Sequence, residues 1–184
     1  TDGLDYLKHY PYECVEQTVS RFLPNVLTTA ALKAAGMSDP ELEANLKEQV
    51  SVGLQRLYSR QNTDGGWGWW PGSSQSNAMV SAYVMFGLWQ AQEAGYDVDD
   101  EIIANGQDYL LYTIENYSMD KDVYNTYKVN RMTFMVYVMS MMDQPVVSYA
   151  VQLADNWKYL SLESQAYLAI TLHNINEEDS RIAT

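Results

Sequence analysis

Apolar residues recur at helical spacing along most of the chain, and no run of alternating apolar and polar residues is long enough to build a sheet. This pattern predicts an all-α fold. The expected helices end where proline or glycine interrupts the pattern, at Pro24, Gly36, Gly95 and Pro145. They cover residues 14–23, 26–35, 40–59, 75–94, 99–116, 129–142, 146–156 and 162–174.

A weak internal repeat relates successive parts of the chain. Residues 53–57 align with residues 106–110, and residues 83–85 align with residues 137–139, at offsets of 53 and 54 residues. Two helices per repeat favour helical hairpins stacked side by side, as in solenoids and in closed α/α toroids. In such a stack, Tyr83 and Tyr137 lie on equivalent inner helices.

The composition narrows the possible partners. With 24 acidic and 11 basic residues the net charge is −13, and no cluster of basic residues could neutralise a phosphate backbone. Nucleic acid is therefore not an expected partner, and without a long apolar run this chain is not expected to insert into a membrane. One Cys and two His exclude an internal disulfide and any zinc site of usual spacing, so no metal or cofactor is expected. The length suits a single domain over residues 1–184.

The segment 10–21 holds the residues best suited to chemistry. Residues three apart on a first helical turn face the same side, so the sulfur of Cys14 can meet the carboxamide of Gln17. Loss of ammonia would join them as a thioester. Because thiolate is a good leaving group, an amine or hydroxyl can attack the Gln17 carbonyl and take over its acyl chain. A purely structural alternative also exists, since a lone Cys near a helix start often packs as a small apolar residue.

With its flanks, this segment resembles the thioester region of the α2-macroglobulin and complement family, particularly its bacterial members. A serine, an arginine and a proline follow the matching residues at the usual places, whereas Glu13 replaces the usual small residue before the Cys. The matching residues are Tyr10, Pro11, Tyr12, Cys14, Glu16 and Gln17.

The resemblance implies a thioester-bearing helical domain, an α/α toroid, from a larger multidomain protein. In such proteins cleavage of a bait segment exposes the thioester, and the attacking protease or a nearby surface becomes tethered. The chain is then expected to be a single-use covalent trap within a broad-spectrum endopeptidase inhibitor, and not a turnover enzyme. Its partners would be proteases or other amine-bearing proteins, together with other domains of the parent chain.

The same resemblance implies a place outside the cytoplasm, in the periplasm or at the cell surface, where bacterial members defend the envelope. A lipid anchor on the parent chain is a further expectation. Toroids of the family close with about six hairpins, whereas a repeat of this length gives about three to four, so an incomplete ring is expected here.

A tryptophan-rich turn at residues 61–71 is the second feature. Its Asp-Gly-Gly sequence, with Asp64 as the cap, predicts a tight turn that tryptophans anchor against neighbouring helices. A thioester survives only where apolar surface excludes water. The expected shield consists of Tyr12, Trp67, Trp69 and Trp70.

Some complement members transfer the acyl group through a downstream histidine. The corresponding stretch here, residues 118–127, contains no His. We therefore expect direct attack on the thioester, with primary amines preferred because they are better nucleophiles than alcohols.

Two rival functions remain open at this point. Asp97, Asp99 and Asp100 match the Asp-x-Asp-Asp motif of terpenoid cyclases, which are also α/α toroids, although acidic residues that open a helix usually cap it. A non-covalent helical-repeat binding module is the other rival, and it predicts an unmodified Cys14 thiol.

Overall fold

The computed structural model describes residues 13–118 and 124–175. Within these ranges the regular structure is helical apart from one isolated bridge between Gln61 and Trp67, which confirms the predicted all-α class. The elements are α2 (Val15–Ala34), α3 (Pro40–Tyr58), α4 (Ala78–Glu93), α5 (Asp100–Glu115), α7 (Thr126–Met141), α8 (Val147–Asp155), the single 3-10 turn η1 (Trp157–Tyr159) and α9 (Leu162–Ile175).

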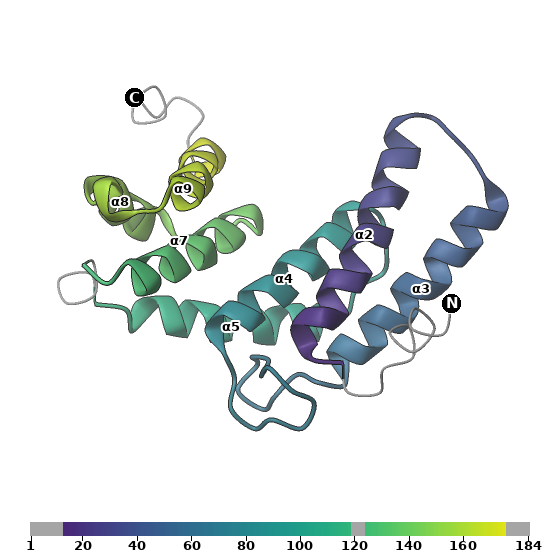
Figure 1. The fold of residues 1–184 in the computed structure, drawn as a ribbon, viewed down its shortest axis with the longest axis horizontal. Coiled ribbons are helices and arrows are strands. Elements are labelled where there is room, and N and C mark those ends of the chain that lie inside the picture. The colour runs from purple at the N-terminus through teal and green to yellow at the C-terminus, as the bar shows by residue number, and fades with distance from the viewer. Residues whose placement is uncertain (1–12, 119–123, 176–184) are drawn as a thin grey trace, which may run out of the picture.

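The helices form two layers that curve into an arc (Figure 1). Helices α2, α4, α7 and α9 contact one another in series, and α3, α5 and α8 pack against them on the outside. This arrangement of hairpins is that of an α/α toroid: the repeat predicted stacked hairpins, and the family resemblance implied the toroid. Among the described helices the ring is open, with α2 and α3 at one end of the arc and α8 and α9 at the other.

The internal repeat of the sequence places a glycine at two points where a helix of the outer layer packs closely on a helix of the inner layer. Gly53 of α3 lies against the ring of Phe22 on α2, and Gly106 of α5 lies against Met85 on α4. A Cβ atom at either glycine would clash with these buried side chains. The prediction that Tyr83 and Tyr137 lie on equivalent inner helices is confirmed, since they belong to α4 and α7.

Helix α2 corrects one prediction, because it runs through Pro24 without a break. A proline inside a helix has no N–H to donate and crowds the preceding turn. The carbonyl of Ser20 therefore lacks its helical partner, and the side chains of Asn25 and Thr28 donate to other carbonyls nearby, those of Arg21 and Pro24, at 3.2 and 2.8 Å. Apolar packing along the helix, which includes the buried Val26, then holds the two halves together.

Helix ends follow their capping residues. Helix α4 begins three residues later than predicted because Asn77 accepts from the N–H groups of its first turn, and α7 begins three residues earlier because Asn125 does the same. The predicted stops at Gly36 and Gly95 are confirmed, since both adopt the left-handed conformation, with φ of 62° and 87°, directly after α2 and α4.

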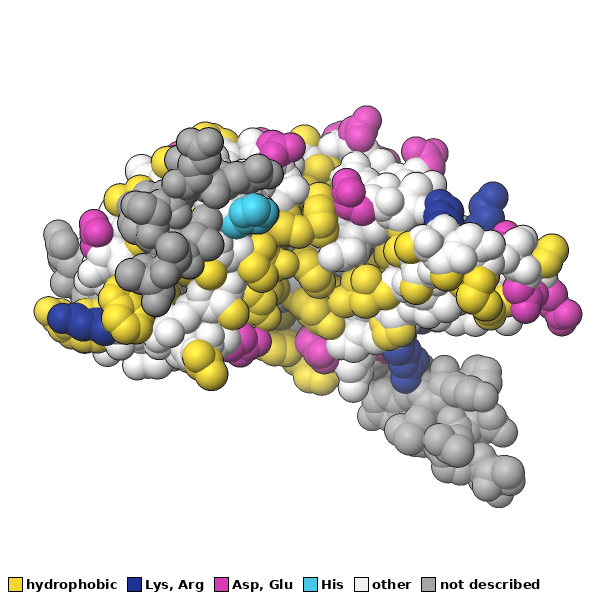
Figure 2. Space-filling view, turned by 90° about the horizontal axis from the view of Figure 1, so that it is seen from above, with side chains coloured by type: hydrophobic (Ala, Val, Ile, Leu, Met, Phe, Trp, Pro, Cys, Tyr) yellow, Lys and Arg dark blue, Asp and Glu magenta, His cyan; other side chains and the backbone are white. Residues whose placement is uncertain are grey.

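One continuous hydrophobic cluster runs through all seven described α-helices. On the face seen in Figure 2, hydrophobic side chains also gather in a band across the middle of the molecule, and acidic side chains lie mainly along its margins. None of the helices in the described ranges is long and apolar enough to cross a membrane.

Candidate functional site

Cys14 and Gln17 face each other across the first turn of α2. Cys14 is the N-cap: its sulfur accepts a hydrogen bond from the backbone N–H of Gln17 at 3.3 Å. In return, Gln17 Oε1 accepts from the backbone N–H of Cys14 at 3.2 Å. This reciprocal pair is a capping box. Sulfur is a weak acceptor, so Cys is an uncommon residue at this capping position.

The two side chains differ in exposure. Cys14 is buried, whereas Gln17 is exposed. An acyl group at Gln17 would therefore be open to attack from outside, while the sulfur that must leave lies inside.

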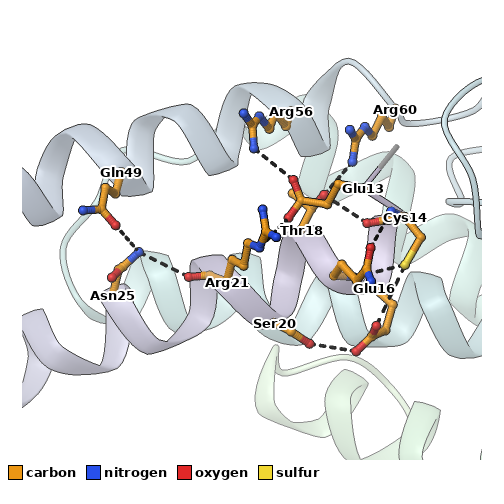
Figure 3. A network of polar contacts seen from close by, with 11 residues as sticks. Glu13, Cys14, Glu16, Thr18, Ser20, Arg21, Asn25, Gln49, Arg56 and Arg60 are labelled. Atoms are coloured by element: carbon orange, nitrogen blue, oxygen red, sulfur yellow. Dashed lines mark hydrogen bonds and ion pairs between the residues drawn. The ribbon is translucent and has the colours of Figure 1, made fainter. Parts of the chain in front are cut away.

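Glu16 contacts Cys14 on one side and, through Ser20, helix α4 on the other. The Cys14 thiol donates a long hydrogen bond of 3.9 Å to Glu16 Oε2. The hydroxyl of Ser20 donates to Glu16 Oε1 at 2.7 Å (Figure 3). Ser20 Oγ lies 3.3 Å from the hydroxyl of Tyr83 on α4. Glu16, which the sequence marked only as part of the motif, is thus half-buried and held in place beside the sulfur.

An arginine cluster anchors the residue before Cys14. Glu13 is only 4% exposed, and its carboxylate accepts from Arg56 Nη1 at 3.0 Å and pairs with Arg21 Nε at 3.4 Å (Figure 3). Sequence reasoning noted Glu13 only as a departure from the family pattern, and no local signal connects it to Arg56 on α3. The structure shows why a carboxylate is tolerated there.

A second arginine contact supports the Cys14 backbone. Thr18 Oγ1 donates to the carbonyl of Cys14 at 3.1 Å and accepts from Arg60 Nη1 at 2.5 Å. Burial lowers the pKa of the Arg60 guanidinium, and the nearby carboxylate of Glu13 opposes that shift. The first turn of α2 is therefore fixed to the end of α3 through both side chains and backbone.

The tryptophan-rich turn meets α2 at the same point. The backbone N–H of Val15 donates to the carbonyl of Trp69 at 3.0 Å. Trp67 is fully buried and donates from Nε1 to the carbonyl of Leu57 at 2.8 Å, so it anchors the turn. Trp69 and Trp70 are 47% and 61% exposed. A role for these three rings in excluding water from the bond remains a prediction.

The tight turn itself is confirmed. The side chain of Asp64 accepts from the N–H of Gly66 at 3.1 Å and from Ser76 Oγ at 2.6 Å. Gly65 has a φ of 84° and lies so close to the carbonyl of Asn105 that no side chain fits. The turn is thereby held against α5.

The remaining motif residues Tyr10, Pro11 and Tyr12 lie outside the described residues. Their contribution to the site, including the predicted shielding by Tyr12, therefore stays a prediction.

A cavity of about 560 Å³ opens on the inner side of the arc, and neither Cys14 nor Gln17 is among its lining residues. Glu16 and Trp69 border it from the α2 side, and side chains of α4, α7 and α9 form the rest. Its walls are largely aromatic, through Tyr83, Phe86, Phe134, Tyr137 and Tyr167. The sequence did not predict this cavity, because its lining comes from helices far apart along the chain.

The Asp-x-Asp-Asp motif that resembles that of terpenoid cyclases opens helix α5. Asp99 caps α5, accepting from the N–H groups of Glu101 and Ile102 at 2.9 and 3.4 Å. Asp97 and Asp100 are exposed, whereas alkene protonation needs an acid enclosed in a cavity. Among the residues that the structure describes, no His, Cys, Asp and Glu side chains cluster in a way that could hold a metal ion.

Comparison with known proteins identifies the family of the chain. The family model "A-macroglobulin TED domain" matches residues 1–133. An alpha-2-macroglobulin of Thermotoga maritima is 44% identical over 109 residues, which make up 59% of this chain and 6% of that protein.

Two solved structures share the fold. Salmonella alpha-2-macroglobulin reacted with methylamine matches with a TM-score of 0.78 and 24% identity, over 98% of this chain and 12% of that one. Trypsin-activated alpha-2-macroglobulin of Escherichia coli matches with a TM-score of 0.75 and 25% identity, over 95% of this chain and 13% of that one. The chain thus spans only a small part of the length of these relatives. Since the family model covers well over half of this sequence, the chain belongs to the A-macroglobulin TED domain family.

Proposed function

We propose that Cys14 and Gln17 form an internal thioester through which this chain covalently captures an attacking nucleophile. The observation that carries the proposal is their reciprocal capping, with contacts of 3.3 and 3.2 Å that hold the sulfur and the carboxamide on one helical turn. No other turn of the chain can offer this pair, because the sequence contains one Cys.

The chemistry proceeds in two balanced steps. First, the Cys14 sulfur attacks the Gln17 carboxamide carbon, ammonia leaves, and the thioester forms. Later, an amine attacks the same carbon, the carbon–sulfur bond breaks, and the sulfur leaves as a thiolate that takes up a proton. The amine remains as a substituted amide of residue 17, so each molecule reacts once.

The proposed target is a protease or another amine-bearing protein, captured while this chain forms part of a longer inhibitor. Support comes from the relatives: the protein of Thermotoga maritima is an alpha-2-macroglobulin, and that of Escherichia coli is described as activated by trypsin. We propose a location outside the cytoplasm, in the periplasm or at the cell surface, and a role in defending the envelope. A single-use trap of this kind is not a turnover enzyme.

Intact-mass measurement tests the thioester directly. The chain is expected to lack the mass of one ammonia as purified. After methylamine treatment it should gain one methylamine at residue 17 and expose one titratable thiol. Cys14→Ser keeps a capping oxygen and serves as the matched control, which should show neither change. An unmodified thiol at Cys14, with no ammonia lost and no adduct at Gln17, would contradict the proposal and favour the non-covalent binding module.

Nucleophile preference is tested in the same material. Because residues 118–127 contain no His, primary amines are expected to react faster than alcohols. Equal capture of glycerol and methylamine in competition would contradict direct attack.

A further inference from the structure

We infer that Glu16 is a catalytic residue of the proposed thioester chemistry, whose carboxylate carries one proton between the Cys14 sulfur and the nitrogen that leaves or attacks the Gln17 carbonyl carbon. The inference rests on the proposed thioester and gives a role to a residue that the sequence marked only as part of the motif. The carboxylate acts both when the bond forms and when an amine opens it.

The Glu16 carboxylate reaches the sulfur with one oxygen and is held in place through the other. Its Oε2 atom accepts the long hydrogen bond of 3.9 Å from the Cys14 thiol, and its Oε1 atom accepts from the hydroxyl of Ser20 at 2.7 Å (Figure 3). Ser20 Oγ in turn lies 3.3 Å from the hydroxyl of Tyr83 on α4. A general base must lie within hydrogen-bond reach of the proton that it takes, and such contacts are often long before the reacting groups meet.

The first turn of α2 supplies the other groups that the reaction needs. The N–H of Gln17 donates to the sulfur at 3.3 Å, where it can stabilise negative charge. The N–H of Cys14 donates to Gln17 Oε1 at 3.2 Å. Since negative charge develops on this oxygen when sulfur or an amine adds to the carbonyl carbon, the N–H of Cys14 stabilises the oxyanion. What the turn still requires is a group that moves the proton.

Glu13, the carboxylate that precedes Cys14 in the chain, is engaged elsewhere. Its Oε2 atom accepts from Arg56 Nη1 at 3.0 Å, and its Oε1 atom pairs with Arg21 Nε at 3.4 Å. Both oxygens of Glu13 therefore face arginines, and the sulfur makes its carboxylate contact with Glu16 instead (Figure 3).

One proton passes through Glu16 in each step. When the thioester forms, Glu16 takes the proton of the Cys14 thiol, and the sulfur attacks the Gln17 carboxamide carbon. Glu16 then gives the proton to the departing nitrogen, which leaves as ammonia. When a neutral amine opens the bond, Glu16 takes a proton from the attacking nitrogen and gives it to the sulfur as the carbon–sulfur bond breaks. The carboxylate is regenerated in both steps.

The two steps need the same group, because formation of the thioester is the reverse of its opening by ammonia. Opening by ammonia would restore the Cys14 thiol and the Gln17 carboxamide, so a path that uses Glu16 in one direction uses it in the other. In both directions the nitrogen joins or leaves the carbon that is bonded to the sulfur. A carboxylate in contact with the sulfur is therefore also close to the nitrogen.

Two nucleophiles separate proton transfer from a structural effect of Glu16. Methylamine must lose a proton as the amide forms, whereas hydroxide opens a thioester without the help of a base. Thiol release is measured with methylamine and, separately, in alkaline buffer without amine. For Glu16→Gln, the reaction with methylamine is expected to slow about a hundredfold, and alkaline hydrolysis should not slow.

A structural role would give a different result. Glu16 lies in the first turn of α2, where a negative charge also complements the helix dipole. If that were its whole contribution, Glu16→Gln would change the access of both nucleophiles to the bond, and the two rates would move together. Urea unfolding of the variant shows in addition whether the fold is kept.

Formation of the bond gives a second measurement on the same variants. Intact mass after purification should show a smaller fraction of chains without ammonia for Glu16→Gln than for the unaltered chain. Ser20→Ala keeps the carboxylate but removes the hydrogen bond that orients it, so the methylamine reaction should slow severalfold. Glu48→Gln and Ser51→Ala make the same changes at exposed positions on α3 and should alter neither measurement.

Two sets of results would overturn the inference in different ways. If Glu16→Gln forms the thioester as fully as the unaltered chain and reacts with methylamine at the same rate, or if both reactions change alike, Glu16 is not catalytic and the thioester stands. If the unaltered chain has lost no ammonia and methylamine releases no thiol from it, the proposed function fails and the role of Glu16 fails with it.

Discussion

Arg56 on α3 donates to Glu13 at 3.0 Å, and Glu13 is the residue directly before Cys14. The Glu13 side chain is 6% exposed, whereas that of Arg56 is 51% exposed. The pair therefore joins a buried carboxylate at the start of α2 to a half-open guanidinium on the outer layer. It fixes the backbone next to Cys14.

Breaking this pair from the arginine side should cost more stability than breaking it from the glutamate side. Arg56→Ala leaves the buried carboxylate with Arg21 alone and is expected to cost about 1–3 kcal/mol in the free energy of unfolding. Glu13→Gln removes the charge and should cost less. Urea unfolding measures both, with Lys47→Ala on the same helix as the exposed control. Equal losses in the arginine and lysine variants would contradict the role of the pair.

Trp67 and Trp70 belong to the same turn but should respond very differently to substitution. Trp67 is fully buried and hydrogen-bonded to Leu57, so Trp67→Ala is expected to cost about 3–5 kcal/mol. Trp70 is 61% exposed, and Trp70→Ala should change stability little. Thermal or urea unfolding compares them. Similar losses in the two variants would mean that the turn is not anchored through Trp67.

Alanine substitutions at two glycines with positive φ distinguish the cost of backbone strain from the cost of a steric clash. At Gly72, with a φ of 78° and open space around it, an added methyl group meets only backbone strain, so Gly72→Ala should cost about 1–2 kcal/mol. At Gly65 the same strain is joined by a clash with the backbone carbonyl of Asn105. Gly65→Ala should therefore unfold at a clearly lower urea concentration than Gly72→Ala, and the reverse order would refute this account.

Alkaline pH should weaken the fold through the cavity tyrosines. Burial raises the pKa of Tyr137, and burial together with the Glu163 carboxylate raises the pKa of Tyr167. Folding thus favours the neutral phenols. The stability they contribute is fully present below about pH 10, the ordinary tyrosine pKa, and is lost as the pH rises through the higher folded values. The urea midpoint measured above about pH 10 should therefore be lower than the midpoint measured below it. This drop should be smaller when Tyr137 and Tyr167 are both replaced by Phe.

The parts of the structure that the sequence predicted depend on local signals. Helical periodicity and the glycine stops at Gly36 and Gly95 gave the element order. The three-residue spacing of Cys14 and Gln17 predicted that their side chains meet, because a first helical turn fixes their mutual geometry. The offset between Gly53 and Gly106 indicated the hairpin stack, since both glycines let an outer helix approach an inner one.

The missed parts depend on contacts between distant segments. Glu13 and Arg56 lie on different elements, and neither residue type signals the other. The aromatic cavity draws its walls from four inner helices, each of which shows an ordinary apolar pattern by itself. Pro24 misled the prediction because local propensity places a break there, while tertiary packing of buried residues on both sides of it, such as Phe22 and Val26, preserves the helix.

The tolerated proline should still carry a cost. Helix α2 lacks one backbone hydrogen bond at Pro24, and this residue is exposed, so Pro24→Ala should restore the bond without disturbing the core. The free energy of unfolding is expected to rise by about 1–3 kcal/mol, after allowance for the freer unfolded chain. Pro40→Ala is the matched control, because a proline at the first position of α3 needs no N–H partner and should give no such gain. A lower urea midpoint for Pro24→Ala than for the unaltered chain would show that the proline stabilises the fold and would contradict this account.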